Sequence, residues 1–141
     1  MLFRSLHVLD PMRVLVTGSR DWTNVDVIKG ALGIAEEWFT DYETHFTLVH
    51  GGCATGADAI AHDALFGSGT RGAAGVGNWA EEVHRADWLK YGRSAGVVRN
   101  REMATSGIDL CLAFWKDGSL GTKNAIEECR KEAIATWIWY E

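Results

Sequence analysis

The stretch FTLVHGGCATGAD, residues 46–58, decides the fold. Phe46–His50 is a short apolar run typical of a buried strand, and the glycine-rich turn 51–56 follows it directly. Beyond that turn, small and apolar residues recur at helical spacing, at Ala57, Ile60, Ala61, Ala64 and Leu65. A strand, a glycine loop and a helix in direct succession predict one unit of a βαβ fold.

The same succession recurs on both sides of this stretch. A strand over 14–17 ends in the loop 18–24 and leads into a helix over 25–42, and a strand over 109–115 leads through 118–122 into another helix. Weaker patterns predict a strand over 82–86, a helix over 94–106 and a final strand over 134–140. Because continuous apolar strands are typical of parallel sheets, we predict an α/β fold, a single Rossmann-like three-layer sandwich with a mostly parallel sheet.

A chain of 141 residues is long enough for one such domain, which we place at residues 12–141. Residues 1–11 are interpreted as an N-terminal extension, because Pro11 is followed by the first strand. The stretch 67–79 is rich in glycine and has no periodicity, so we expect a surface loop there.

Composition excludes several classes of protein. The chain is 47% hydrophobic and 23% charged, contains no apolar run of membrane-spanning length and opens without a signal-peptide pattern. A net charge of −5 argues against a non-specific nucleic-acid binder, and DNA is an unexpected partner. Three widely spaced cysteines without a CxxC pair predict reduced thiols, hence a cytoplasmic protein.

Chemistry is expected at the carboxyl edge of the sheet, where three loops rich in glycine and hydroxyl residues precede helices: 18–24, 51–58 and 118–122. Each loop alone is compatible with an ordinary strand-to-helix turn. Together they predict a phosphate-bearing ligand, because glycine lets backbone N–H groups approach an anion and the helix dipole favours negative charge there.

Standard nucleotide fingerprints are absent or incomplete. Residues 51–58 have the glycine spacing of a P-loop, but Ala57 and Asp58 replace its Lys and Ser/Thr. The GxGxxA match at 75–80 follows no predicted strand. His50 with Cys53 has metal-ligand spacing, and Asp58 with His62 is spaced i,i+4, but no further pair has compatible spacing, so no metal is expected. No cofactor is expected either.

Several side chains near the loops allow two interpretations. Arg20 suits either a phosphate clamp or a solvated loop position, and only one of Arg99 and Arg101 is expected to face the cleft. His50 at a strand end suits an acid/base role or a structural one. Two tryptophans beside these loops, Trp22 and Trp88, suit core packing better than base stacking.

Five segments together resemble a known family: 18–22, 50–58, 86–88, 95–100 and 121–122. In this order they resemble the YspA/YpsA-related branch of the SLOG superfamily, which is common in bacteria and phages and is related to the LOG phosphoribohydrolases and to DprA. The resemblance covers about residues 12–140, and the HGGxxTGAD-type segment is its most specific part. It implies a Rossmann-like fold that binds nucleotides or nucleotide-derived ligands.

The resemblance also implies which residues bind the ligand or its phosphate: Gly18, Ser19, Arg20, Gly51, Gly52, Thr55, Gly56, Asp58, Arg99, Asn100, Gly121 and Thr122. In the LOG enzymes a PGGxGTxxE motif supplies a catalytic Glu, and here Ala125 stands at that position. Glu127 lies two residues further, about 200° around a helix, and is expected to point elsewhere. This departure argues against LOG-type hydrolysis.

Two functions therefore remain open. The first is a sensing or binding module for a nucleotide or a nucleotide-derived ligand. The alternative is a nucleotide-processing enzyme of the LOG-like N-glycosidic hydrolase type, with Asp58 and Arg99 as its catalytic candidates. Both faces of the last strand are apolar, with Trp137 and Trp139 on one and Ile138 and Tyr140 on the other, which suits either a buried strand or a dimer contact. A homodimer is expected, partly because the family resemblance implies one.

Overall fold

The computed structural model describes residues 10–39, 44–67 and 78–141. Within them, five strands form one parallel sheet in the order β3-β2-β1-β4-β5. The strands are β1 (Met12–Gly18), β2 (Phe46–His50), β3 (Trp79–Val83), β4 (Leu110–Trp115) and β5 (Thr136–Tyr140). The predicted fold class is confirmed.

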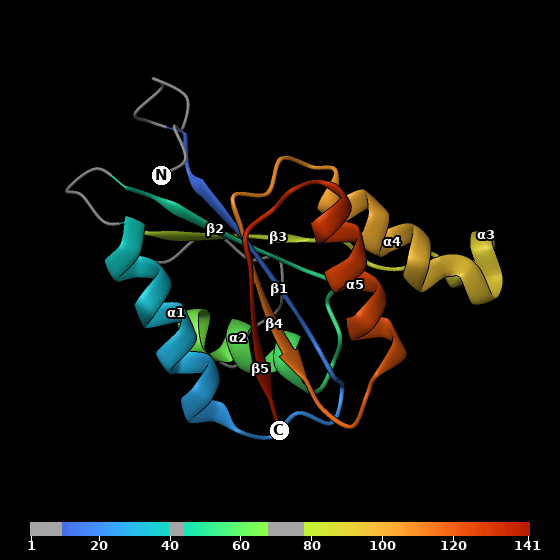
Figure 1. Ribbon diagram of the computed structural model, residues 1–141, viewed down its shortest axis with the longest axis horizontal. Coiled ribbons are helices and arrows are strands. Elements are labelled where there is room, and N and C mark those ends of the chain that lie inside the picture. The colour runs from blue at the N-terminus through green and yellow to red at the C-terminus, as the bar shows by residue number, and fades with distance from the viewer. Residues whose placement is uncertain (1–9, 40–43, 68–77) are drawn as a thin grey trace.

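Helices cover both faces of the sheet (Figure 1). They are α1 (Val25–Phe39), α2 (Ala57–Phe66), the one-turn α3 (Trp88–Tyr91), the short 3₁₀ turn η1 (Gly92–Ser94), α4 (Ala95–Ala104) and α5 (Leu120–Lys131). Figure 1 shows α1 and α2 on one side of the sheet, and α4 and α5 on the other. None of the helices in the described part of the chain is long and apolar enough to cross a membrane.

Successive side chains of the central strand β1 point to opposite faces of the sheet, and each face has its own hydrophobic core. Val14 and Val16 of β1 lie in the larger core beneath α1 and α2, whereas Leu15 between them lies in the smaller core beneath α4 and α5. Each core buries apolar side chains from helices and strands, as a sheet covered on both faces requires. The two layers of helices thereby fix the loops that join strands to helices.

The third strand differs from the prediction. A strand was expected over 82–86, but β3 spans Trp79–Val83. Trp79 is buried, and its ring stacks on Phe46 of β2 with 4.8 Å between ring centroids. Two consecutive glutamates obscured this strand in the sequence, although each is paired in the fold: Glu81 with His50, and Glu82 with Arg13.

The helix expected over 94–106 is shorter, because α4 spans Ala95–Ala104. The one-turn helix α3 before it was not predicted. It begins after Asp87, whose carboxylate accepts a hydrogen bond from the backbone N–H of Lys90, as an N-cap residue does. Most of the predicted extension and of the predicted surface loop, residues 1–9 and 68–77, lies outside the described residues.

The strand order locates the switch point of the sheet. The chain runs from β1 outward through β2 to β3 on one side, and then crosses to β4 and β5 on the other side. The connections that leave β1 and β4 therefore diverge at their carboxyl ends. In open α/β sheets this switch point is where ligands bind.

Candidate functional site

A cleft of about 600 Å³ opens at this switch point, and we call it the main cleft. Its volume lies within the usual range for small-molecule sites, about 300–1,000 Å³. Eight of the twelve predicted binding residues line it: Gly18, Arg20, Gly51, Asp58, Arg99, Asn100, Gly121 and Thr122. The structure thus brings together residues that are more than 100 positions apart in the chain.

A second, smaller cavity of about 280 Å³ adjoins the main cleft, and we call it the second hollow. Two further predicted residues, Gly52 and Thr55, line only this hollow. The remaining two predicted residues, Ser19 and Gly56, line neither cavity.

Ser19 and Gly56 hold the loop after β1 against the other two loops. The Ser19 hydroxyl accepts a hydrogen bond from the Lys116 N–H at 2.9 Å and contacts the Lys116 carbonyl at 3.2 Å, which joins the loop after β1 to the loop after β4. A Cβ on Gly56 would lie 2.2 Å from the Ser19 carbonyl oxygen, and Gly56 has a φ of +76°. Only glycine satisfies both conditions at this position.

The loop after β2 uses its N–H groups within the protein. Oδ2 of Asp58 accepts from the N–H groups of Gly51 at 3.2 Å and Cys53 at 3.3 Å. The Gly52 N–H donates to Nδ1 of His50 at 2.9 Å. Since the protein's own carboxylate and imidazole take these donors, this loop does not offer them to a phosphate.

Glycine instead makes room here for two arginines. A Cβ on Gly51 would lie 2.0 Å from a guanidinium nitrogen of Arg99, and one on Gly52 would lie 2.9 Å from a guanidinium nitrogen of Arg85. Arg99 donates to the Gly51 carbonyl at 3.1 Å, and Arg85 donates to the Gly52 carbonyl at 3.2 Å. The two adjacent glycines therefore let two guanidinium groups lie against one loop.

The third loop has a different construction. Ser119 is the N-cap of α5, and its hydroxyl accepts from the Thr122 N–H at 3.4 Å and from the Thr122 hydroxyl at 3.2 Å. Asn100 of α4 donates to the Gly121 carbonyl at 3.3 Å and to the side chain of Asn124 at 2.9 Å. These bonds hold the amino end of α5 at the wall of the main cleft.

Arginine dominates the charge of both cavities. Arg20, Arg93 and Arg99 line the main cleft together with Asp21 and Asp58, whereas the second hollow has three arginines, Arg20, Arg85 and Arg99, and no Asp or Glu among its lining residues. Guanidinium groups are the preferred partners of phosphate oxygens. A chain of net charge −5 thus concentrates positive charge at one edge of its sheet.

Sequence reasoning missed Arg85, Arg93 and Asn124 as lining residues. Arg85 and Arg93 belong to the segment around α3, which was not predicted, and Asn124 lies one residue before the position compared with the LOG glutamate. The prediction that only one of Arg99 and Arg101 faces the cleft is confirmed, because Arg101 instead pairs with Glu128 and Glu132.

The tryptophans beside the loops differ in environment. Trp22 is buried and packs edge-to-face against Phe114 at 5.5 Å, as expected for core packing. Trp88 is 53% exposed and lines both cavities. The expectation that Trp88 is a core residue is wrong, because α3 holds its ring at the rim of the site.

His50 belongs to a buried triad behind the loop. Its Nε2 lies 2.7 Å from Oε2 of Glu81, and Nδ1 of His62 lies 2.6 Å from the same oxygen. Because Nδ1 of His50 accepts from the Gly52 N–H, its proton is on Nε2 and points to Glu81. His50 is fully buried and lines neither cavity, so its place is that of a structural residue.

The same three residues bring potential metal-ligand atoms within 4.8 Å of one another. A histidine that ligates a metal usually donates through its other ring nitrogen to an oxygen acceptor. In His50 that other nitrogen accepts a hydrogen bond instead. We therefore interpret the group as a hydrogen-bonded triad.

Two further side chains limit nucleophilic and acid chemistry in the cleft. Cys53 lines it, but burial, followed by the negative charge of Asp58, raises the pKa of its thiol. Ala125 is buried, and Glu127 is exposed and outside both cavities, as predicted. The described carboxylates that line the main cleft are those of Asp21 and Asp58.

Comparison with known proteins agrees with this geometry. Residues 12–91 match the family described as the YspA, cpYpsA-related SLOG family. The chain belongs to this family. It is also 42% identical over 122 residues to the Gene 61 protein of Mycobacterium phage D29, an alignment that covers 86% of this chain and 91% of that relative. No solved structure matches this SLOG-family chain.

Proposed function

We propose that the main cleft binds a nucleotide or a nucleotide-derived ligand and that the protein is a sensing or binding module. The observation that carries this proposal is the meeting of Arg20, Arg93 and Arg99 with the amino end of α5 in one cleft. Guanidinium groups and the positive end of a helix dipole both favour a phosphate. Gly121 and Thr122 lie in the first turn of α5, where we expect one phosphate group to be bound.

The rest of the cleft lining suits a nucleoside. Trp88 offers an exposed ring for stacking on a base, with Val97 and Leu120 as apolar neighbours in the lining. Asp21 and Asn124 offer an acceptor and an amide to hydroxyl groups or base edges. The lining thus combines apolar surface with a few polar groups, as small-molecule sites do.

A pool of nucleotides offered to the purified protein tests the proposal. Bound and free fractions are separated and analysed by mass spectrometry, and we expect an intact nucleotide in the bound fraction. The double variant Arg20→Ala/Arg93→Ala removes two exposed cleft cations, and we expect it to weaken binding by tenfold or more. Arg130→Ala, an exposed arginine outside both cavities, is the matched control. A protein that retains no nucleotide at all would overturn the proposal.

The second candidate function is N-glycosidic hydrolysis of a nucleotide. It is favoured by one observation, that Asp58 and Arg99 both line the cleft. Against it, Oδ2 of Asp58 already accepts two loop N–H groups, and Ala125 stands where the LOG enzymes have glutamate. Free base and ribose phosphate in the nucleotide incubation, lost in Asp58→Asn, would establish hydrolysis in place of binding alone.

We further infer a homodimer through β5 and a cytoplasmic location. Strand β5 is at the edge of the sheet, all its residues are at least partly exposed, and Tyr140 is 71% exposed. An apolar edge strand of this kind favours pairing with a second copy. Light scattering should give a dimer mass that Tyr140→Lys reduces to a monomer mass. Three free thiols support a reducing compartment.

A further inference from the structure

We propose that the second hollow is a binding site for a second phosphate, so that the ligand is a nucleotide with two phosphate groups. This inference rests on the proposed function and assigns a role to Arg85, which lines the hollow and not the main cleft. It names the class of ligand: nucleotides in which a second phosphate accompanies the first.

The size of the hollow favours a subsite. At about 280 Å³ it lies just below the usual range for a separate small-molecule site. Five residues line both cavities: Arg20, Gly51, Cys53, Trp88 and Arg99. A ligand in the main cleft can therefore extend past Trp88 into the hollow without leaving the protein surface.

The charge of the hollow favours an anion more strongly than the charge of the main cleft does. In the main cleft, Asp21 and Asp58 offset part of the charge of three arginines. Among the described residues that line the second hollow, three are arginines and none is an Asp or Glu. Guanidinium groups around a small cavity are suited to a phosphate, which accepts several charge-assisted hydrogen bonds.

Two of these arginines are held in place before any ligand binds. Arg99 donates to the Gly51 carbonyl and Arg85 to the Gly52 carbonyl, at 3.1 and 3.2 Å. Side chains at both glycine positions would collide with these guanidinium groups. Arg85 uses one nitrogen for its bond, whereas Arg99 uses two, because its Nε also donates to the Asn100 side chain at 2.9 Å and its Nη1 to the His84 carbonyl at 3.5 Å. A guanidinium group has five N–H donors, so N–H groups of both arginines remain for a phosphate. Such positioning lowers the entropy cost of binding.

Calorimetric titration with matched nucleotides tests the inference. The probes are the four nucleoside 5′-monophosphates together with the 5′-diphosphate and the 3′,5′-bisphosphate of each base. For the preferred base, we expect at least one two-phosphate form to bind ten times more tightly than the monophosphate, about 1.4 kcal/mol. Arg85→Gln should reduce that ratio to less than about threefold.

Two further variants make the result specific. Arg85→Glu should make the two-phosphate form bind more weakly than the monophosphate, because it places a negative charge against the second phosphate. Arg130→Gln, outside both cavities, should retain the full preference. Arg85 is exposed, and equal melting temperatures of the variants would show that the fold is unchanged.

The outcomes separate this inference from the proposed function. Monophosphate binding with no gain from a second phosphate would overturn the inference and leave the proposed function standing. A gain that survives Arg85→Gln would overturn the assignment of the second phosphate to this hollow. Failure of every probe to bind would overturn the proposed function and the inference with it.

Discussion

The loops at residues 51–58 and 118–122 differ in construction although both are glycine-rich and both enter a helix at the same sheet edge. In the loop after β2, Asp58 and His50 take the backbone donors, and the glycines admit arginine side chains. In the loop after β4, a Cβ on Gly121 would meet nothing within 4 Å, and Ser119 caps the helix. The loop after β2 is a platform for guanidinium groups, whereas the loop after β4 forms the start of helix α5.

For the proposed ligand, this difference gives two ways of attracting a phosphate. The loop after β2 would act through side chains from other elements, because Arg85 follows β3 and Arg99 belongs to α4. The loop after β4 would act through its own backbone and the dipole of α5. Mutations in the loop after β2 should therefore affect both the fold and the positions of arginines from other elements. Mutations in the loop after β4 should act locally.

The largest expected effect is that of Asp58→Ala on stability. This change removes a buried carboxylate that accepts from two loop N–H groups, and bonds to charged groups contribute about 1.5–3 kcal/mol each. Because water can reach part of the loop, we expect a loss of about 2–4 kcal/mol in the free energy of unfolding, measured by urea titration. Asp63→Ala, an exposed position on the same helix, should change it by less than about 0.5 kcal/mol. Equal stability of the two variants would show that Asp58 does not organise the loop.

Gly51→Ala should have the next largest effect, and it should fall on ligand affinity. The added methyl group would occupy the position of the Arg99 guanidinium, which must move away from the loop. We expect nucleotide affinity to fall by tenfold or more, about 1.4 kcal/mol, in calorimetric titration. Gly30→Ala, at an exposed helix position with open space around it, is the control and should leave affinity unchanged. An unaltered affinity in Gly51→Ala would show that the position of the Arg99 guanidinium does not contribute to nucleotide binding.

Sequence patterns were sufficient for the architecture because the strands and most helices carry clear periodicity. Val14–Val16 and the residues of β4 are apolar throughout, and this pattern alone predicts buried parallel strands. Strand β3 was misplaced because Glu81 and Glu82 lie in its middle. Their polar partners, His62 and Arg13, are distant in the chain, so no local pattern indicates that these carboxylates are paired.

The site was predictable where it follows strand ends, and was missed where tertiary packing decides. Gly18 ends β1, Gly51 directly follows β2 and Gly121 lies in the first turn of α5, so the strand and helix patterns were enough to place these three glycines. The hydrogen bonds from the Gly51 and Gly52 N–H groups to Asp58 and His50 could not be predicted, because they depend on how α2 packs against β2. The position of Arg85 could not be predicted either, because Arg85 reaches the loop through the pairing of β3 with β2.

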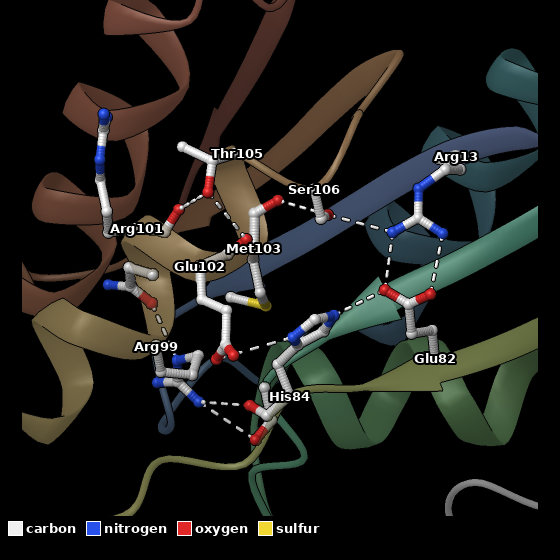
Figure 2. Close-up of polar contacts among 11 residues, drawn as sticks. Arg13, Glu82, His84, Arg99, Arg101, Glu102, Met103, Thr105 and Ser106 are labelled. Atoms are coloured by element: carbon white, nitrogen blue, oxygen red, sulfur yellow. Dashed lines mark hydrogen bonds and ion pairs between the residues drawn. The ribbon is translucent and has the colours of Figure 1, made fainter.

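Glu82→Gln tests how much the Glu82 carboxylate stabilises the folded protein, and how that stabilisation changes at low pH. Its expected effect is smaller than those of Asp58→Ala and Gly51→Ala. Two Arg13 nitrogens bond the Glu82 carboxylate at 2.6 and 2.8 Å, and His84 contacts it at 2.6 Å, just before Arg85 (Figure 2). Hydrogen bonds from Arg13, with a further contribution from His84, lower the pKa of Glu82 to about 2. Because the pKa in the folded protein is below that of the unfolded chain, this stabilisation is full above about pH 4.5 and is lost as the pH falls towards 2.

The Glu82 side chain is 37% exposed, so solvent screening reduces its contribution to about 1 kcal/mol. We expect Glu82→Gln to lose about that much stability at pH 7, and to show a flatter stability profile than the unmodified protein between pH 5 and pH 2. Glu127→Gln, exposed on α5, is the control. A variant profile that falls as steeply as the original would mean that other carboxylates dominate acid unfolding.

Gly121→Ala should have the smallest effect. It should raise the free energy of unfolding and lower the nucleotide affinity. Alanine is favoured over glycine in a helix by about 1 kcal/mol, and in the first turn of α5 we expect a gain of about 0.5 kcal/mol. If a phosphate is bound at this turn, the new methyl group stands between it and the backbone, and nucleotide affinity should fall about threefold. Thermal unfolding and calorimetry of the same preparation measure the two effects. A more stable protein with unchanged affinity would place the phosphate among the arginines alone, and the loop after β4 would then shape the cleft without binding its ligand.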